Sequence, residues 1–315
     1  MLVKRMITIL AVLGLLVATL ALPAAATTAE DSTPDTSTTG SEFGTETGGD
    51  VTPSGVILPT SPQAAAKENM VKLWAKAKES GNDALAAAIV RSYEEAWGLA
   101  SESGGIDSGM GVSLSSSGGV LPMAGQYSTH ILGVVQAAQT KSYYCGPASG
   151  YMTIREMKGS RYTSRYDGST LSQTAMANAN HMRTDINGGT SWSSGYFIRG
   201  VNRWLGSSTF VQSNRPGASL FSWIVTFSTD SAGQPIAPDT VEFRYGVHYN
   251  HHPSDKTIGH WIVADGYYSY GATTHFADPA GQSSAVSWGY LASRYFTYAT
   301  TNFANSFLQN NGVAW

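Results

Sequence analysis

The sequence predicts an α+β domain over residues 123–315, with helices first along the chain and strands after them. Apolar residues recur at helical spacing in the first half of this range. Aromatic and β-branched residues dominate three short runs in the second half. A chain of this length can bury one sizeable core, and such segregated elements favour an antiparallel sheet.

The individual elements of this domain follow from the same two patterns. Three segments have the apolar spacing and the boundary residues of helices: Cys145–Met157, Thr170–Met182 and Trp192–Leu205. Three segments have the composition of strands: Val241–His248, His260–Tyr268 and Thr274–Ala277.

The first 26 residues have the features of a secretory signal peptide. Lys4 and Arg5 precede an apolar run, and three alanines at 24–26 provide a small-residue cleavage site. The alternative is an uncleaved membrane anchor, for which the apolar run is near the short limit. Cleavage predicts a secreted protein that could stay at the cell surface, without stable membrane insertion once the signal is removed.

A helical hairpin is predicted over residues 61–100, between two linkers. Residues 27–60 are rich in Thr, Ser, Gly and acidic residues, which predicts a disordered linker, and residues 101–122 form a Ser/Gly-rich one. Ser61 is a suitable helix cap, Pro62 suits the first turn, and residues 80–83 break the apolar pattern. Both apolar faces need a partner, so the hairpin is either a scaffold docked on the main domain or a propeptide that shields a site.

Charge and cysteine content exclude several classes of protein. The formal net charge is −3, so the chain lacks the basic surface of a nucleic-acid-binding protein. A single cysteine excludes a disulfide within one chain. We therefore expect a monomer that binds no nucleic acid and uses no cofactor.

Cys145, the only cysteine, is either a small buried apolar residue or a nucleophile. Gly146 and Pro147 follow it, and the helical spacing after them places the thiol at a helix N-terminus. The helix dipole and the unpaired N–H groups there favour the thiolate, which is the form that attacks a carbonyl carbon. This position predicts a thiol pKa below its ordinary value.

His260 is the strongest candidate for a base that activates this thiol. It begins an apolar strand, so its ring can face a cleft, although an ordinary edge histidine would have the same pattern. Asp278 ends a later strand and could orient the imidazole if the two strands pair, or it could simply form a turn with Pro279. Asp265 is a rival for the orienting role, but its odd offset from His260 places it on the opposite face of the strand.

A thiol hydrolase also needs hydrogen-bond donors for the oxyanion. Gln139 lies shortly before Cys145, and its amide could donate together with the Cys145 backbone N–H. Gln136 is a competitor for this role, and a polar loop residue is the plainer interpretation of either glutamine.

Three histidines lie within five positions, at His248, His251 and His252. Three imidazoles could bind zinc, but no cysteine is nearby and the segment runs into Pro253 as a loop does. We therefore expect a solvated loop at the mouth of the site, and no metal.

Four stretches, in the order in which they occur, resemble a known family. They are Gln139, Tyr143–Ser149, Gly259–Tyr267 and Phe276–Ala280. Together they resemble the bacterial bacteriocin-processing cysteine peptidases of the papain-like superfamily, and more closely their secreted relatives that lack a transporter domain. The resemblance covers about residues 127–300.

This resemblance implies a papain-like fold, in which a helical part carries the cysteine and an antiparallel sheet carries the histidine and the aspartate. It implies that Cys145 is the nucleophile, His260 the general base and then acid, Asp278 the orienting group and Gln139 an oxyanion donor. We expect a secreted thiol hydrolase that cleaves peptide bonds in a protein or peptide substrate. The alternatives are a cell-wall peptide amidase, an acyl transferase on the same triad, or a non-catalytic binding module that has kept the fold.

Overall fold

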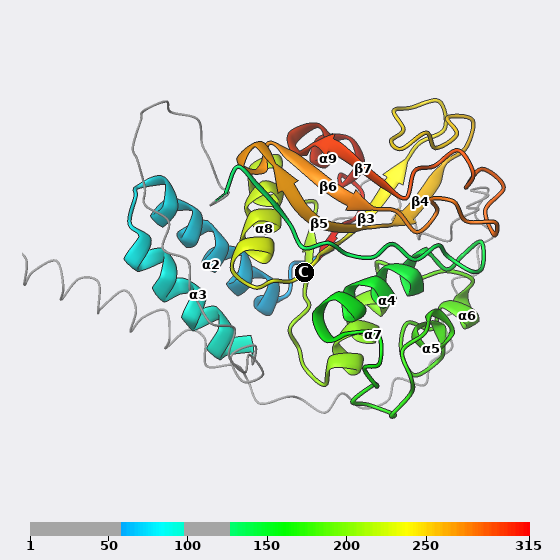
Figure 1. Ribbon diagram of the computed structural model, residues 1–315, viewed down its shortest axis with the longest axis horizontal. Helices are drawn as coiled ribbons and strands as arrows, with labels where there is room; N and C mark the ends of the chain where they lie inside the picture. Colours follow the sequence, from blue (N-terminus) through cyan, green and yellow to red (C-terminus); the bar gives the residue numbers. More distant parts are fainter. Residues whose placement is uncertain (1–57, 98–126) are drawn as a thin grey trace, which may run out of the picture. The chain divides into compact units, whose positions relative to one another are not determined.

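The computed structural model describes residues 58–97 and 127–315, which belong to one compact unit (Figure 1). These residues form an α+β structure with two four-stranded antiparallel sheets. The predicted signal peptide and both predicted linkers lie outside the described residues, apart from residues 58–60. Within the two described ranges, no helix is both long enough and apolar enough to cross a membrane.

The first sheet has the strand order β1-β5-β6-β7. Its strands are β1 (Thr129–Ile131), β5 (Val263–Tyr268), β6 (Thr273–Ala277) and β7 (Tyr295–Ala299). Neighbouring strands pair antiparallel throughout, and the β5–β6 pair places Val263 opposite Ala277. The end of β6, and therefore Asp278, lies next to the beginning of β5.

The second sheet has the order β2-β8-β3-β4. Its strands are β2 (Gln212–Asn214), β8 (Gly312–Ala314), β3 (Ala237–Glu242) and β4 (Ile258–Trp261). Only Ile262 separates β4 from β5, and its N–H donates to the carbonyl oxygen of Pro238 at 3.1 Å. The chain that carries His260 thus passes directly from one sheet into the other, which brings His260 to the end of β6.

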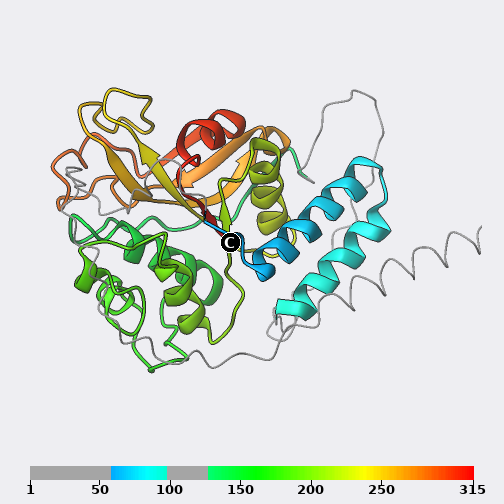
Figure 2. The same cartoon turned by 180° about the vertical axis from the view of Figure 1, so that it is seen from behind.

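Six α-helices and one 3-10 helix accompany the sheets in the described part of the chain that follows residue 126. Their bounds are α4 (Cys145–Lys158), α5 (Gln173–Ala177), α6 (Thr184–Asn187), α7 (Tyr196–Leu205), α8 (Ala218–Asp230) and α9 (Thr300–Phe307), with the 3-10 helix η1 (Ser269–Gly271). Helix α4 packs on α5 and α7 and also contacts β4, whereas α8 packs on α9 and β5. Figures 1 and 2 show α4 to α7 in one group beside the strands.

Of these seven helices, six are α-helical and η1 is a single 3-10 turn. The first expected helix is confirmed, since α4 covers Cys145–Lys158. The second is wrong over most of its length, because only Gln173–Ala177 is helical and Ser172 caps it. The third begins later than expected, at Tyr196, because Gly195 adopts a left-handed conformation with φ 65° that an α-helix does not continue through.

The expected strand Val241–His248 is wrong beyond its second residue. Strand β3 ends at Glu242, and residues 243–257 form a loop. Tyr245 has φ 63°, which is incompatible with an extended strand. The sequence pattern also gave no indication of α8 or α9, so helices and strands alternate more than their composition suggests.

Trp261 connects the second sheet to the helices around α4. Its ring stacks on Phe197 of α7, with centroids 4.2 Å apart and planes 8° apart. Its indole Nε1 donates to the carbonyl oxygen of Thr190 at 3.0 Å, and its own carbonyl oxygen accepts from Ser149 Oγ of α4 at 3.1 Å. These contacts fix the strand that carries His260 against the helix that begins with Cys145.

The predicted hairpin is observed as α2 (Pro62–Glu79) and α3 (Asp83–Trp97), with Ser61 as the cap of α2. Trp74 and Tyr93 both meet the ring of Phe227 in α8 edge-on, with centroids 5.3 and 4.9 Å away. These contacts dock the hairpin on the main domain, and both the scaffold and the propeptide interpretation stay predictions.

Lys67 of α2 is fully buried at the junction between the hairpin and the main domain. Its Nζ donates to the carbonyl oxygens of Thr209 and Trp315, at 2.9 and 2.8 Å, and lies 4.3 Å from the centroid of the Trp315 ring. Burial lowers the pKa of this ammonium, while the two oxygens and the ring faces compensate for part of the lost hydration.

Replacing Lys67 with methionine keeps the apolar stem but removes the donor to the buried main-chain oxygen of Thr209 and leaves that of Trp315 with the Val211 N–H alone. We expect Lys67→Met to lower the free energy of unfolding by about 2 kcal/mol, since an unpaired buried polar group costs roughly 1–3 kcal/mol. Denaturant unfolding followed by tryptophan fluorescence measures the change. Lys72→Met is the matched control, because Lys72 is on the same helix, partly exposed, and only 3.8 Å from Glu68. The control should change stability by less than about 0.5 kcal/mol, and equal effects would show that Lys67 does not anchor the hairpin.

Candidate active site

Cys145 is the first residue of α4, as the sequence predicts, and it is fully buried. Backbone N–H groups of Trp261 and Gly146 point at its sulfur. A Cβ atom at Gly146 would collide with the side chain of Thr190, so only glycine allows this close approach. The thiol is therefore held between the start of α4 and the backbone of β4.

The expectation of a lowered thiol pKa is wrong for this arrangement. Burial raises the pKa of Cys145 to about 12, and the negative charges of Asp239 and Asp278 act in the same direction. The N–H groups of Trp261 and Gly146 stabilise the thiolate but do not compensate for the lost hydration. The start of a helix is therefore not sufficient to lower the thiol pKa. Cys145 is a neutral thiol at pH 7 in this state.

His260 lies on β4 opposite Thr240 of β3 and is fully buried. Its Nε2 is 2.8 Å from Oδ1 of Asp278. A carboxylate accepts a hydrogen bond, so Nε2 carries a proton. Nδ1 is buried and makes no hydrogen bond, so it is not bonded to the thiol either. Trp261 nevertheless links the two residues, since it follows His260 and its N–H reaches the sulfur.

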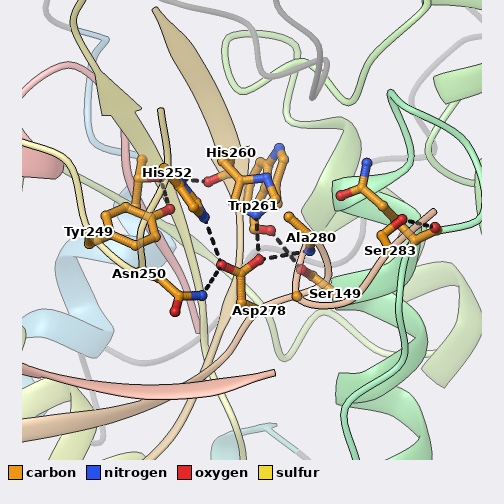
Figure 3. Close-up of polar contacts among 12 residues, drawn as sticks. Ser149, Tyr249, Asn250, His252, His260, Trp261, Asp278, Ala280 and Ser283 are labelled. Atoms are coloured by element: carbon orange, nitrogen blue, oxygen red, sulfur yellow. Dashed lines mark hydrogen bonds and ion pairs between the residues drawn. The ribbon is translucent and has the colours of Figure 1, made fainter. Parts of the chain in front are cut away.

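Asp278 follows β6 and is the centre of the polar network shown in Figure 3. Its carboxylate accepts four hydrogen bonds: from His260 Nε2 (2.8 Å), His252 Nε2 (2.9 Å), Asn250 Nδ2 (2.7 Å) and the Ala280 N–H (2.7 Å). Burial opposes its ionisation, but the two imidazoles outweigh burial and hold its pKa well below the usual range. Asp278 is thus a carboxylate that faces His260, and its orienting role stays a prediction.

His252 and Glu242 belong to this network, although the sequence placed His252 only in a solvated loop and gave no sign of Glu242. His252 Nδ1 is 2.6 Å from Oε1 of Glu242, and its Nε2 is 2.9 Å from Oδ2 of Asp278. The solvated loop expected here is wrong for His252, which is buried between two carboxylates, and for His248, whose Nδ1 is 2.8 Å from Oε2 of Glu242. Only His251 of the three is exposed. Spacing alone could not reveal the pairing, because it depends on how residues 243–257 fold back over β3.

His252 is held as a cation. Burial disfavours its charged form, but Glu242 and Asp278 outweigh burial and raise the pKa of His252 to about 9. The geometry leads to the same conclusion, because each ring nitrogen faces a carboxylate oxygen and must therefore carry a proton.

Ligand atoms of His252, His260 and Asp278 lie within 4.8 Å of one another, close enough for a metal ion. Their nitrogens already donate to the carboxylate, and a doubly protonated His252 offers no lone pair to a metal. A metal ion would therefore have to displace these protons, and the expected absence of a metal stays a prediction.

Gln139 is near the site but has no donor available in this state. Its Nε2 donates to the carbonyl oxygens of Lys141 and Ser142, at 3.0 and 2.9 Å, which uses both amide hydrogens. Gln136 Nε2 likewise donates to the carbonyl oxygens of Asp278 and Gly281, at 2.8 and 2.9 Å. The oxyanion role of Gln139 stays a prediction, and it requires the amide to leave at least one of its present partners.

Asp265, the rival orienting group, faces away from His260. It accepts from the Val134 N–H at 3.0 Å and is 2.6 Å from Nδ1 of His275. It lies at a β-bulge between Ala264 and Gly266, which changes the simple alternation along β5.

Comparison with known proteins finds no matching family model, no matching curated protein and no matching solved structure. The chemical interpretation of the site therefore depends on its own residues. A thiol at a helix start, an imidazole with a free Nδ1 and a carboxylate on the other ring nitrogen are the parts that a thiol hydrolase needs.

The pKa of His252 predicts how stability depends on pH. A histidine whose pKa rises from 6.5 to about 9 on folding contributes stability that is fully present below pH 6.5 and is lost as the pH rises through 9. We expect the free energy of unfolding to fall over this interval by on the order of 3 kcal/mol. Denaturant titrations at several pH values measure the slope. His252→Gln should remove this slope, and an unchanged slope in the variant would show that His252 is not the titrating group.

Proposed function

We propose that this protein is a cysteine hydrolase that cleaves peptide bonds with Cys145 as nucleophile, His260 as base and Asp278 as orienting group, in a papain-like arrangement. The observation that carries the proposal is the hydrogen bonding of the His260 ring. Its Nε2 donates to Asp278, and its buried Nδ1 has no hydrogen-bond partner. An imidazole fixed in this tautomer by a carboxylate is prepared to accept a proton at the other nitrogen.

The chemistry follows the usual course for a thiol nucleophile. Nδ1 of His260 accepts the thiol proton as the sulfur of Cys145 attacks the carbonyl carbon. The imidazolium then gives that proton to the leaving amine as the C–N bond breaks, and a thioester remains on Cys145. Water, deprotonated by the same Nδ1, attacks the thioester, and the proton returns to the sulfur as the acid leaves.

Because the thiol is neutral, His260 must accept its proton during the reaction. With a thiol pKa of about 12, little thiolate exists at pH 7 before the substrate arrives. Proton transfer to Nδ1 must therefore accompany the attack, which is general-base catalysis rather than reaction of a preformed ion pair. Because Cys145, His260 and Asp278 are all buried, productive binding also requires the surrounding segments to separate and Nδ1 to come within reach of the sulfur.

The second candidate is a non-catalytic binding module that has kept the same arrangement. The observation in its favour is the same buried thiol, which has a raised pKa and makes no hydrogen bond with Nδ1 of His260. In such a module Cys145 would serve only as a small core residue.

Single substitutions distinguish these two functions. Cys145→Ala and His260→Ala should each lower the rate of peptide hydrolysis by roughly 10³-fold or more, because both groups take part in bond making and breaking. Asp278→Asn should cost less, since its role is orientation. Hydrolysis of casein and of purified cell-wall material measures the loss and also separates a peptidase from a wall amidase.

Covalent labelling provides an independent measurement on the only cysteine of the chain. A peptidyl epoxide should label Cys145 in the wild type, and His260→Ala should slow this labelling strongly because the base is gone. His275→Gln is the matched control, since His275 also pairs with a buried aspartate but contacts Asp265 instead. Labelling that is equally slow in all three proteins would favour the binding module.

A further inference from the structure

The network behind His260 continues well beyond Asp278. From the base outward it consists of His260, Asp278, His252, Glu242 and His248, and neighbouring members lie 2.6–2.9 Å apart. Imidazoles and carboxylates alternate along this series, so every anion lies between two potential cations. The hydrolase proposed above uses only its first two members.

The geometry fixes the charge of the middle member. His252 has a carboxylate oxygen on each ring nitrogen, so both nitrogens must donate and the ring is an imidazolium. Its centroid is 5.4 Å from that of His260, and it binds the oxygen of Asp278 that His260 does not use. Asp278 therefore presents His260 with a carboxylate whose charge is balanced by a fixed cation on its far side.

We propose that His252 is a positioning residue that cancels the charge of Asp278, so that His260 keeps a well-oriented Nε2 proton without being held as an imidazolium. This inference rests on the hydrolase function proposed above. A lone buried carboxylate would stabilise protonated His260 and deprive the site of its base. With His252 in place, the Asp278–His252 pair acts on His260 as a neutral hydrogen-bond acceptor would.

Other charged and titratable groups around the site do not replace His252. Asp239 of β3 lies opposite Trp261 and adds negative charge near Cys145. Tyr249 contacts the His252 ring at 4.6 Å between centroids and is kept neutral, because burial raises its pKa well above the ordinary value. Glu242 is an anion that holds His252 charged, and His248 contacts Glu242 on its other oxygen. Among the described groups, His252 is the imidazolium in direct contact with Asp278.

Trp288 makes this charge balance more effective by excluding water. Its ring lies 4.4 Å from that of His252 and 6.4 Å from that of His260, measured between centroids, and it is almost fully buried. Charges that are not screened by solvent interact more strongly, so loss of the cation should be felt directly at His260.

The test compares four proteins: the wild type, His252→Gln, the double variant His252→Gln/Asp278→Asn, and His275→Gln. Glutamine at 252 can still donate to Asp278 but carries no charge. The titration of the His260 imidazole is followed by long-range ¹H–¹⁵N NMR, and the acid limb of kcat/KM is measured against pH on a peptide substrate.

We expect His252→Gln to raise the pH at which His260 titrates by on the order of one unit, a tenfold gain in proton affinity, as is typical when an opposite charge within a few ångströms is left unbalanced. The acid limb of kcat/KM should move with it. Asp278→Asn in the same chain removes the unbalanced anion and should return both values toward the wild type. His275→Gln should leave the His260 titration and the acid limb unchanged, since the aspartate that His275 contacts is Asp265.

A purely structural role for His252 would lower kcat at every pH without moving the His260 titration or the acid limb of kcat/KM. That result would overturn the proposal.

The wild type alone provides a test that does not depend on any variant folding. The imidazole of His252, recognised by its contact with the indole of Trp288, should show two protonated nitrogens at pH 7. A single neutral tautomer of His252 would overturn the proposal. Failure of the proposed hydrolase function is recognised separately, because the NMR titration of His260 needs no turnover. If His260 titrates at a higher pH in His252→Gln but the protein hydrolyses no peptide, only the hydrolase function is rejected.

Discussion

The candidate site depends on one buried anion, the carboxylate of Asp278. Removing a carboxylate from water is costly unless hydrogen bonds and opposite charge replace its hydration, and four donors do so here. Those donors come from β4, from the loop after β3 and from the turn after β6, so satisfying Asp278 brings three separate segments of the chain together. The same contacts determine the tautomer of His260 and the protonation of His252.

The two sheets explain how these segments meet. The chain passes from β4 to β5 through Ile262 alone, so His260 in one sheet lies next to the strand that pairs with β6 in the other. Trp261 then ties this crossing point to the helices: its ring packs on Phe197, and its N–H reaches the sulfur of Cys145. Trp261 thus lies between His260, which precedes it in the chain, and the sulfur of Cys145, while the carboxylate of Asp278 comes from the neighbouring sheet.

Local sequence patterns correctly predicted the helix start at Cys145 and the strand before Asp278. Cys145 at the start of α4 and the β6 strand that leads to Asp278 followed from proline, apolar spacing and β-branched composition. The loop over residues 243–257 could not be predicted, because Tyr245, Asn250 and His251 adopt positive φ values that their residue types do not announce. The thiol pKa was predicted in the wrong direction for a related reason: helix polarity is visible in a sequence, but the depth of burial, which dominates here, is a property of the whole fold.

The raised pKa of the Cys145 thiol and the charge of His252 both follow from burial of the site away from water. Burial penalises an isolated thiolate, yet it also strengthens the attraction that keeps His252 protonated between Glu242 and Asp278. Cys145, whose sulfur faces two N–H groups but also the negative charge of two carboxylates, therefore stays neutral, whereas His252 between two anions becomes charged. Cys145 can gain its negative charge only when something in the site accepts the proton and a substrate accepts the electron pair. In the proposed mechanism Nδ1 of His260, which has no hydrogen-bond partner, meets the first condition, and His252 preserves that condition by balancing the carboxylate behind His260.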